Sequence, residues 1–241
     1  MIKQTPGKIY LADQRGEAGT TQFRRYCTFN FEDYQQEHKE PFGSLEVFNE
    51  EMLAGSGNIT LTVDKDSHVI LMPITGALTL NTTHGGTNTI DVEEILINTL
   101  PAKSTIHLTN SYQSDVISFL QIRLKASRPI ITNSWLLSNF ELNAGKNQLM
   151  PIVLPEKEQR VLHQFPFYLS IGQFDGRQEA IYRLKNKSNG FFAFVVAGAF
   201  EVEGRLLHEK DGLALWNTEE VELEALSPNA LIVVIEFEIG E

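Results

Sequence analysis

The chain has 241 residues, 42% of them hydrophobic, and its 31 acidic and 20 basic residues give a formal net charge of -11. This acidity argues against direct nucleic-acid binding, because like charges repel a phosphate backbone. The single Cys27 excludes an internal disulfide, the first residues lack the apolar stretch of a signal peptide, and no apolar run approaches the about 20 residues of a membrane helix. We therefore expect a cytoplasmic protein with no nucleic-acid or membrane partner.

Short runs rich in Val, Ile, Leu, Phe and Thr fill the first half of the chain and are separated by Gly, Asn and Asp turn signals. No segment before Lys125 shows the period of an amphipathic helix. The pattern predicts strands over residues 44–53, 58–63, 68–74, 77–81, 89–97, 104–110 and 115–124.

Residues 126–160 interrupt this pattern with proline, serine, asparagine and a charged run, which predicts a long connection between two domains. We place an N-terminal domain over 1–128, and the connecting segment with a C-terminal domain over 129–241. Strand-like runs resume after the connection, at 166–174, 178–184, 191–197, 199–207, 213–217, 221–226 and 230–239.

The two halves of the chain echo each other around Gly76 and Gly198. In both places an apolar strand meets a glycine and continues as an alternating strand, which is typical of a hairpin corner where glycine turns at low cost. The sequence therefore predicts an all-β protein of two tandem cupin-type jelly-roll barrels.

Several motifs occur in one order along nearly the whole chain. They are FNFEDYQQEHKEPFGSLEVFNEEMLAGSG at 29–57, GAL at 76–78, FLQI at 119–122 and DGLALW at 211–216. Together they resemble the pirin family, whose bacterial members include pirin-like quercetinases. The resemblance implies a bicupin fold and suggests a dioxygenase activity on quercetin.

The same resemblance implies a divalent iron-type metal in the first barrel, held by a His-Pro-His segment and a later His-x-Glu pair. Counting from Gly76, these ligand positions fall on Thr62, Asp64, His107 and Thr109. Three of the four ligand types have changed, and threonine is a poor ligand for such a metal. We therefore predict a degenerate metal site and no cofactor, with a divalent iron-type metal as the alternative.

Asp64, Asp66 and His68 are spaced two apart, as ligands on one strand face would be. A strand rises about 3.3 Å per residue, so the three together span too far for one ion. A rebuilt site could use only a neighbouring pair. We interpret residues 63–67 as a solvent-facing polar turn or strand end, with such a rearranged centre as the alternative. For His107 we expect a hydrogen bond with a neighbouring hydroxyl, such as that of Thr62 or Thr109.

Three functional hypotheses follow. The first is a pirin-like protein that has lost its metal centre and binds an unidentified small molecule or protein in a binding or regulatory role. The second is a quercetin 2,3-dioxygenase-like oxidoreductase that uses an altered centre of His107 and Asp64. The third is a metal-independent enzyme with His107 as acid or base. The sequence assigns no catalytic residue.

Overall fold

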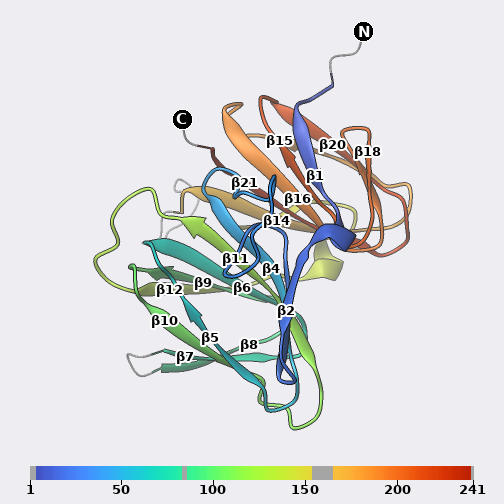
Figure 1. The fold of residues 1–241 in the computed structure, drawn as a ribbon. Helices are drawn as coiled ribbons and strands as arrows, with labels where there is room; N and C mark the ends of the chain where they lie inside the picture. The colour runs from blue at the N-terminus through green and yellow to red at the C-terminus, as the bar shows by residue number, and fades with distance from the viewer. Residues whose placement is uncertain (1–3, 83–85, 154–164, 240–241) are drawn as a thin grey trace. The chain divides into compact units, whose positions relative to one another are not determined.

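The computed structural model describes residues 4–82, 86–153 and 165–239. The chain forms two compact units, one made of residues 15–140 and the other of residues 1–14 together with 141–241 (Figure 1). The first unit thus continues past the expected boundary at 128, because a strand at 134–139 pairs within it. Nowhere in these described ranges is there a helix of the length and apolarity needed to cross a membrane.

The first unit contains a large and a small sheet, and all pairings between its described strands are antiparallel. The 7-stranded sheet has the order β12 (Ser134–Asn139), β9 (Glu94–Leu100), β6 (Ser67–Thr75), β11 (Ile117–Lys125), β4 (Leu45–Leu53), β3 (Phe23–Cys27) and β2 (Gly16–Gly19). The 4-stranded sheet has the order β5 (Asn58–Thr62), β10 (Thr105–Thr109), β7 (Leu78–Thr82) and β8 (Gly86–Ile90).

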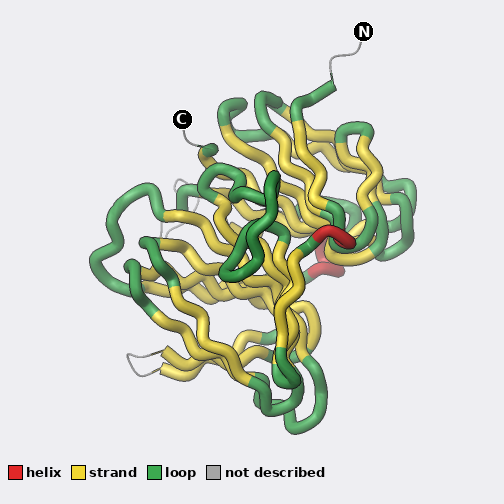
Figure 2. Tube along the Cα trace, in the orientation of Figure 1, coloured by secondary structure: helices red, strands yellow, loops and turns green. Residues whose placement is uncertain are grey.

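The second unit repeats this plan, with strand again along most of its described length and only two short 3-10 helices, η1 (Ala12–Gln14) and η2 (Leu142–Gly145) (Figure 2). Its 6-stranded sheet has the order β1 (Gly7–Tyr10), β19 (Gly212–Leu215), β16 (Asn189–Ala197), β21 (Ala230–Glu238), β14 (Phe167–Phe174) and β13 (Met150–Val153). Its 4-stranded sheet has the order β15 (Glu179–Arg183), β20 (Glu220–Ala225), β17 (Phe200–Val202) and β18 (Arg205–Leu207).

Each unit has its own apolar core between its two sheets, built from every second residue of the strands. In the first unit the small sheet contributes side chains such as Leu61 and Leu108, and the large sheet contributes Leu71 and Phe119. This arrangement confirms the predicted all-β fold of two cupin-type barrels.

The glycine corners are also confirmed. Gly76 and Gly198 both have a positive φ, of 70° and 79°, at the turns that lead into β7 and β17. A side chain at either position would be strained in this left-handed conformation, so glycine is required there.

Three predicted segments differ from the structure. The expected strand 89–97 is broken by a turn at 91–93, and the expected strand 199–207 is a hairpin that turns at Glu203 and Gly204, both with positive φ. The expected connection over 126–160 contains strands β12 and β13. β12 lies at the edge of its sheet with alternating partial exposure, so its mixed composition concealed it from pattern reading.

Candidate binding site in the first barrel

The four predicted ligand positions do not face the interior of the first barrel. Thr62 and His107 occupy exposed positions on β5 and β10, Asp64 is exposed just beyond β5, and Thr109 is partly exposed on the same face as His107. The buried face of these strands belongs instead to their sequence neighbours.

The interior positions of this region are Leu61, Val63, Ile106 and Leu108, all of them members of the apolar core. Because side chains alternate along a strand, a slip of one residue moves every predicted ligand to the opposite face. A metal inside the barrel needs nitrogen, oxygen or sulfur ligands, and these four side chains offer none. The residues present therefore do not fit the metal centre that the family resemblance implies.

Elsewhere in the ranges 4–82, 86–153 and 165–239, no group of three or more His, Cys, Asp and Glu side chains could hold a metal ion. The residues of the 64–68 stretch have separate environments. Asp66 accepts hydrogen bonds from the backbone N–H groups of Ala102 and Ile130, both at 2.8 Å, and these hold the pKa of its carboxyl below the usual range. Asp66 thus ties two loops together, as a structural polar turn does.

His68 is buried on β6, where its Nδ1 lies 3.0 Å from the Thr99 hydroxyl, and burial lowers the pKa of its imidazole to about 4. His107 forms the expected kind of hydrogen bond, but with a different partner: its Nδ1 lies 2.9 Å from the hydroxyl of Thr60. The cross-strand register explains this choice, because His107 lies directly opposite Thr60 on β5.

A polar cluster lies on the inner face of the large sheet, the same face that contributes side chains to the apolar core. It occupies β3, β4, β11 and β9, and its position follows from the register: Arg25 lies opposite Glu51, and Asn49 lies opposite Gln121. All of its members are buried, with exposed fractions from 0 to 6%. We call this set the inner polar cluster; its members are Arg25, Asn49, Glu51, Asn98, Gln121 and Arg123.

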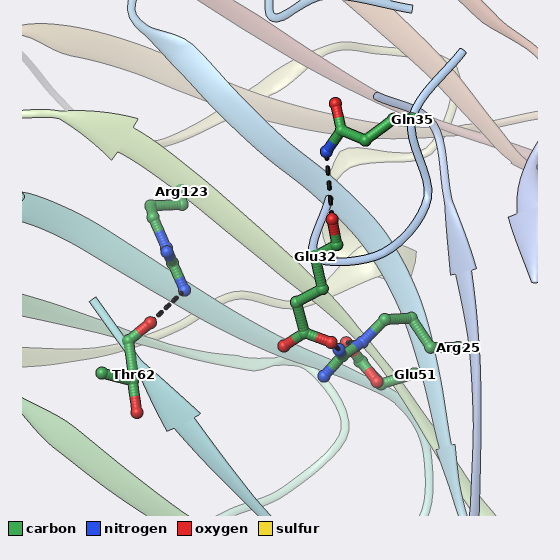
Figure 3. Close-up of polar contacts among 6 residues, drawn as sticks. All are labelled: Arg25, Glu32, Gln35, Glu51, Thr62 and Arg123. Carbon is green, nitrogen blue, oxygen red and sulfur yellow. Dashed lines mark hydrogen bonds and ion pairs between the residues drawn. The ribbon is translucent and has the colours of Figure 1, made fainter. Parts of the chain in front are cut away.

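Arg25 anchors one end of the cluster with two carboxylates (Figure 3). Its Nε donates to Glu51 at 2.5 Å, and its Nη1 donates at 2.7 Å to Glu32, whose side chain is largely exposed. Burial raises the pKa of Glu51 to about 7, although the Arg25 guanidinium opposes this shift. The other carboxyl oxygen of Glu51, Oε2, has no hydrogen-bond partner among the residues that the structure describes.

Arg123 forms the other charged part of the cluster. Its Nη2 donates to the backbone carbonyl of Thr62 at 3.1 Å, as Figure 3 also shows, while its Nε has no hydrogen-bond partner. Across the described part of the chain, no carboxylate forms an ion pair with it. Desolvation consequently lowers the pKa of this guanidinium.

The Phe31 ring lies over both guanidinium groups, with its centroid 4.7 Å from the Arg25 carbon and 5.8 Å from that of Arg123. Phe31 belongs to the irregular segment 28–44, which also supplies Glu32. Within this segment Gln35 donates to the backbone carbonyl of Glu32 at 3.0 Å, which holds Glu32 in its left-handed conformation beside Arg25. The segment therefore borders the cluster on the side from which Glu32 reaches solvent.

The two amides at the centre of the cluster are fully buried without hydrogen bonds. Neither the nitrogen nor the oxygen of Asn49 or of Gln121 has a partner of normal hydrogen-bond geometry, although Asn49 is close enough to Glu51 to favour its charged form. The nitrogen of Asn98 is also unpaired. Unpaired buried polar groups are costly and uncommon in native proteins, so their concentration here identifies a candidate binding site.

Sequence reasoning missed this cluster, although one signal was present. Asn49 and Glu51 are in phase with the buried Leu53 on β4, and Gln121 is in phase with the buried Phe119 on β11. Polar residues at core positions of a strand are unusual and would have identified the site.

The two sandwiches, each with its own core, define the class of protein: a bicupin. Residues 156–237 match the family model described as the quercetinase C-terminal cupin domain. No curated protein sequence matches the chain.

Among solved structures, YhhW from Escherichia coli is similar to the chain, with a TM-score of 0.85 and 16% identity over 98% of this chain and 99% of that one. The nickel(II) complex of the bacterial pirin YhhW from Escherichia coli has a TM-score of 0.82 and 17% identity, covering 97% and 99%. A quercetin 2,3-dioxygenase from Acinetobacter baumannii has a TM-score of 0.72 and 13% identity, covering 100% and 89%. The predicted resemblance to the pirin family is confirmed, and the fold is that of a bicupin.

Proposed function

We propose that this chain is a pirin-like bicupin without a metal centre, which acts by binding a small molecule or a protein. One observation supports this most strongly: the interior positions of β5 and β10 and their ends are Leu61, Val63, Ile106 and Leu108. Hydrocarbon side chains at these positions offer an iron-type ion no ligand.

The alternative is an oxidoreductase like the quercetin 2,3-dioxygenases that share the fold. It would have to use Asp64 and His107, both of which lie on the exposed side of the small sheet. The third hypothesis, acid–base catalysis by His107, meets the same difficulty, because the imidazole is exposed and its hydrogen-bond partner is the hydroxyl of Thr60.

The test is elemental analysis of the purified, untagged chain after incubation with iron, manganese, nickel, copper and zinc, followed by a flavonol turnover assay. We expect far less than one metal ion per chain and no turnover. His107→Ala is the control, because it removes the one family ligand type that remains. Near-stoichiometric metal that is lost in His107→Ala would contradict the proposal and support the altered-centre dioxygenase.

A further inference from the structure

We propose that the inner polar cluster binds a small hydroxy acid, with Arg123 as the counter-cation of its carboxylate and the Gln121 and Asn49 amides as partners of its carboxylate and hydroxyl groups. This inference rests on the proposed binding role and names the site and the chemical class of its ligand.

Arg123 carries a buried charge with no ion-pair partner among the described residues. Arg123 is 6% exposed. The charges of Glu46, Asp64 and Glu32 act on its guanidinium, but none of these carboxylates forms an ion pair with it, and Glu46 is itself paired with Lys65 at 3.0 Å. A buried guanidinium without a close carboxylate is unfavourable unless another anion compensates it. Its unpaired Nε is a donor suited to a carboxylate oxygen.

The cluster has both unpaired donors and unpaired acceptors. The unpaired donors are Arg123 Nε and the amide nitrogens of Asn49, Gln121 and Asn98, whereas the unpaired acceptors are Glu51 Oε2 and the amide oxygens of Asn49 and Gln121. A carboxylate can accept from the donors but gives nothing to the acceptors. A hydroxyl group on the same ligand adds one O–H donor for one of these acceptors, which favours a hydroxy acid over a simple carboxylate.

The polar groups of the cluster lie on adjacent strands of one sheet face. Gln121 and Arg123 are two residues apart on β11 and share its inner face, and Asn49 lies directly opposite Gln121 on β4. Glu51 is two residues further along β4, on the same face. The polar groups are therefore neighbours on one surface rather than scattered through the barrel.

The test is isothermal titration calorimetry of the full chain with four probes: lactate, propionate, lactamide and inorganic phosphate. Lactate should bind saturably at one site, propionate about 10-fold more weakly because it lacks the hydroxyl, and lactamide below detection because it lacks the charge. Phosphate binding without lactate binding would overturn the hydroxy-acid assignment. No heat with any probe would overturn the proposal and leave ordered water as the occupant of the cluster.

Two variants connect binding to the cluster. Arg123→Met keeps the aliphatic length but removes the charge, and should weaken lactate binding by about 10 to 100-fold. Gln121→Glu keeps the shape and supplies an internal carboxylate beside Arg123, so it should also abolish lactate binding, with the fold retained by circular dichroism. Arg177→Met is the control, because Arg177 is an exposed arginine of the second unit that pairs with Glu224.

Lactate binding that is unchanged in Gln121→Glu would contradict the site even if Arg123→Met failed to fold. The two proposals also fail separately. Stoichiometric metal together with intact lactate binding would contradict the metal-free function but support this binding site. Absence of both metal and lactate binding would contradict the binding site but remain consistent with the metal-free function.

Discussion

The two barrels differ most clearly at one equivalent position. β11 and β21 are both nine-residue strands at the centre of their large sheets, and the seventh residue is Arg123 in the first barrel and Glu236 in the second. Both are buried charges. Glu236 accepts hydrogen bonds from Tyr182 Oη at 2.9 Å and Asn189 Nδ2 at 2.7 Å, and from two backbone N–H groups, of which the shorter is that of Lys185 at 2.8 Å.

Arg123 by contrast has one backbone carbonyl as a hydrogen-bond partner and an unpaired Nε. The fifth strand position shows the same difference: Gln121 in the first barrel, with both amide atoms unpaired, corresponds to the apolar Val234 in the second. In the described part of the second unit, the one buried side-chain nitrogen or oxygen without a hydrogen bond is Glu224 Oε1, and this atom has an ion pair with Arg177. The same fold thus uses its polar interior for structure in one barrel and, we infer, for binding in the other.

The largest expected effect on stability comes from removing the fully hydrogen-bonded carboxylate of Glu236. Glu236→Leu would leave the Tyr182 hydroxyl and the Asn189 amide buried without an acceptor, so it should lower the free energy of unfolding by about 3–5 kcal/mol. Gln121→Leu is the matched control: it replaces unpaired polar atoms with hydrocarbon and should change stability by less than about 1 kcal/mol, or increase it. Urea denaturation of both variants measures the contrast, and equal losses would show that Gln121 is also structurally satisfied.

The second effect is the pH dependence contributed by Glu51. Its pKa is about 7 in the folded chain against an ordinary value of 4.5, so between these pH values the folded state binds the proton more readily than the unfolded state. The contribution of Glu51 is therefore fully present below pH 4.5 and is lost as the pH rises to 7, by about 3 kcal/mol at most.

The measurement is the difference in unfolding free energy between wild type and Glu51→Gln from pH 4.5 to 8, where shifts of other groups largely cancel. Wild type should lose stability relative to the variant as the pH rises. A difference that grows in the opposite direction would mean that the Arg25 ion pair, rather than desolvation, dominates the titration of Glu51.

Much of the fold could be predicted because strands and corners leave local signals. Alternating apolar residues predicted most of the strands, and the glycines at 76 and 198 predicted two hairpin corners. On β5 and β10 the apolar residues of the alternating pattern are the buried ones, so the pattern itself predicts the inner face. The metal positions counted from Gly76 fall on the opposite, polar face, because that count fixes a position along the chain and does not report which face is buried. Whether Gln121 is hydrogen-bonded depends on side chains from other strands, which no local pattern reports.

The third prediction compares two variants that place the family's metal ligands, three His and one Glu, on the inner or on the outer face of β5 and β10. Replacing Leu61, Val63 and Ile106 by His and Leu108 by Glu would direct the family's ligand types into the barrel, where side chains from facing strands converge. The variant should be less stable without metal and should gain about 2.7 kcal/mol when nickel is present at 100 times its dissociation constant.

The matched variant keeps His107 and adds Thr62→His, Asp64→His and Thr109→Glu, which places the same set on the exposed face. Side chains diverge on that face, so nickel should bind much more weakly and produce little shift in the unfolding temperature. Differential scanning calorimetry with and without nickel compares the pair. A stronger nickel effect in the outward set would show that the exposed positions can form the metal centre after all.

The smallest expected effect belongs to His107 itself. The side chain is exposed and its hydrogen bond joins it to the Thr60 hydroxyl, so His107→Ala should change the free energy of unfolding by no more than about 0.5 kcal/mol. His68→Ala, which removes a buried imidazole bonded to Thr99, should cost about 1–3 kcal/mol in the same urea titration. If His107→Ala lowered the free energy of unfolding more than His68→Ala, the His107 side chain would have to be buried in the barrel. The outward orientation of His107, on which the metal-free function depends, would then be wrong.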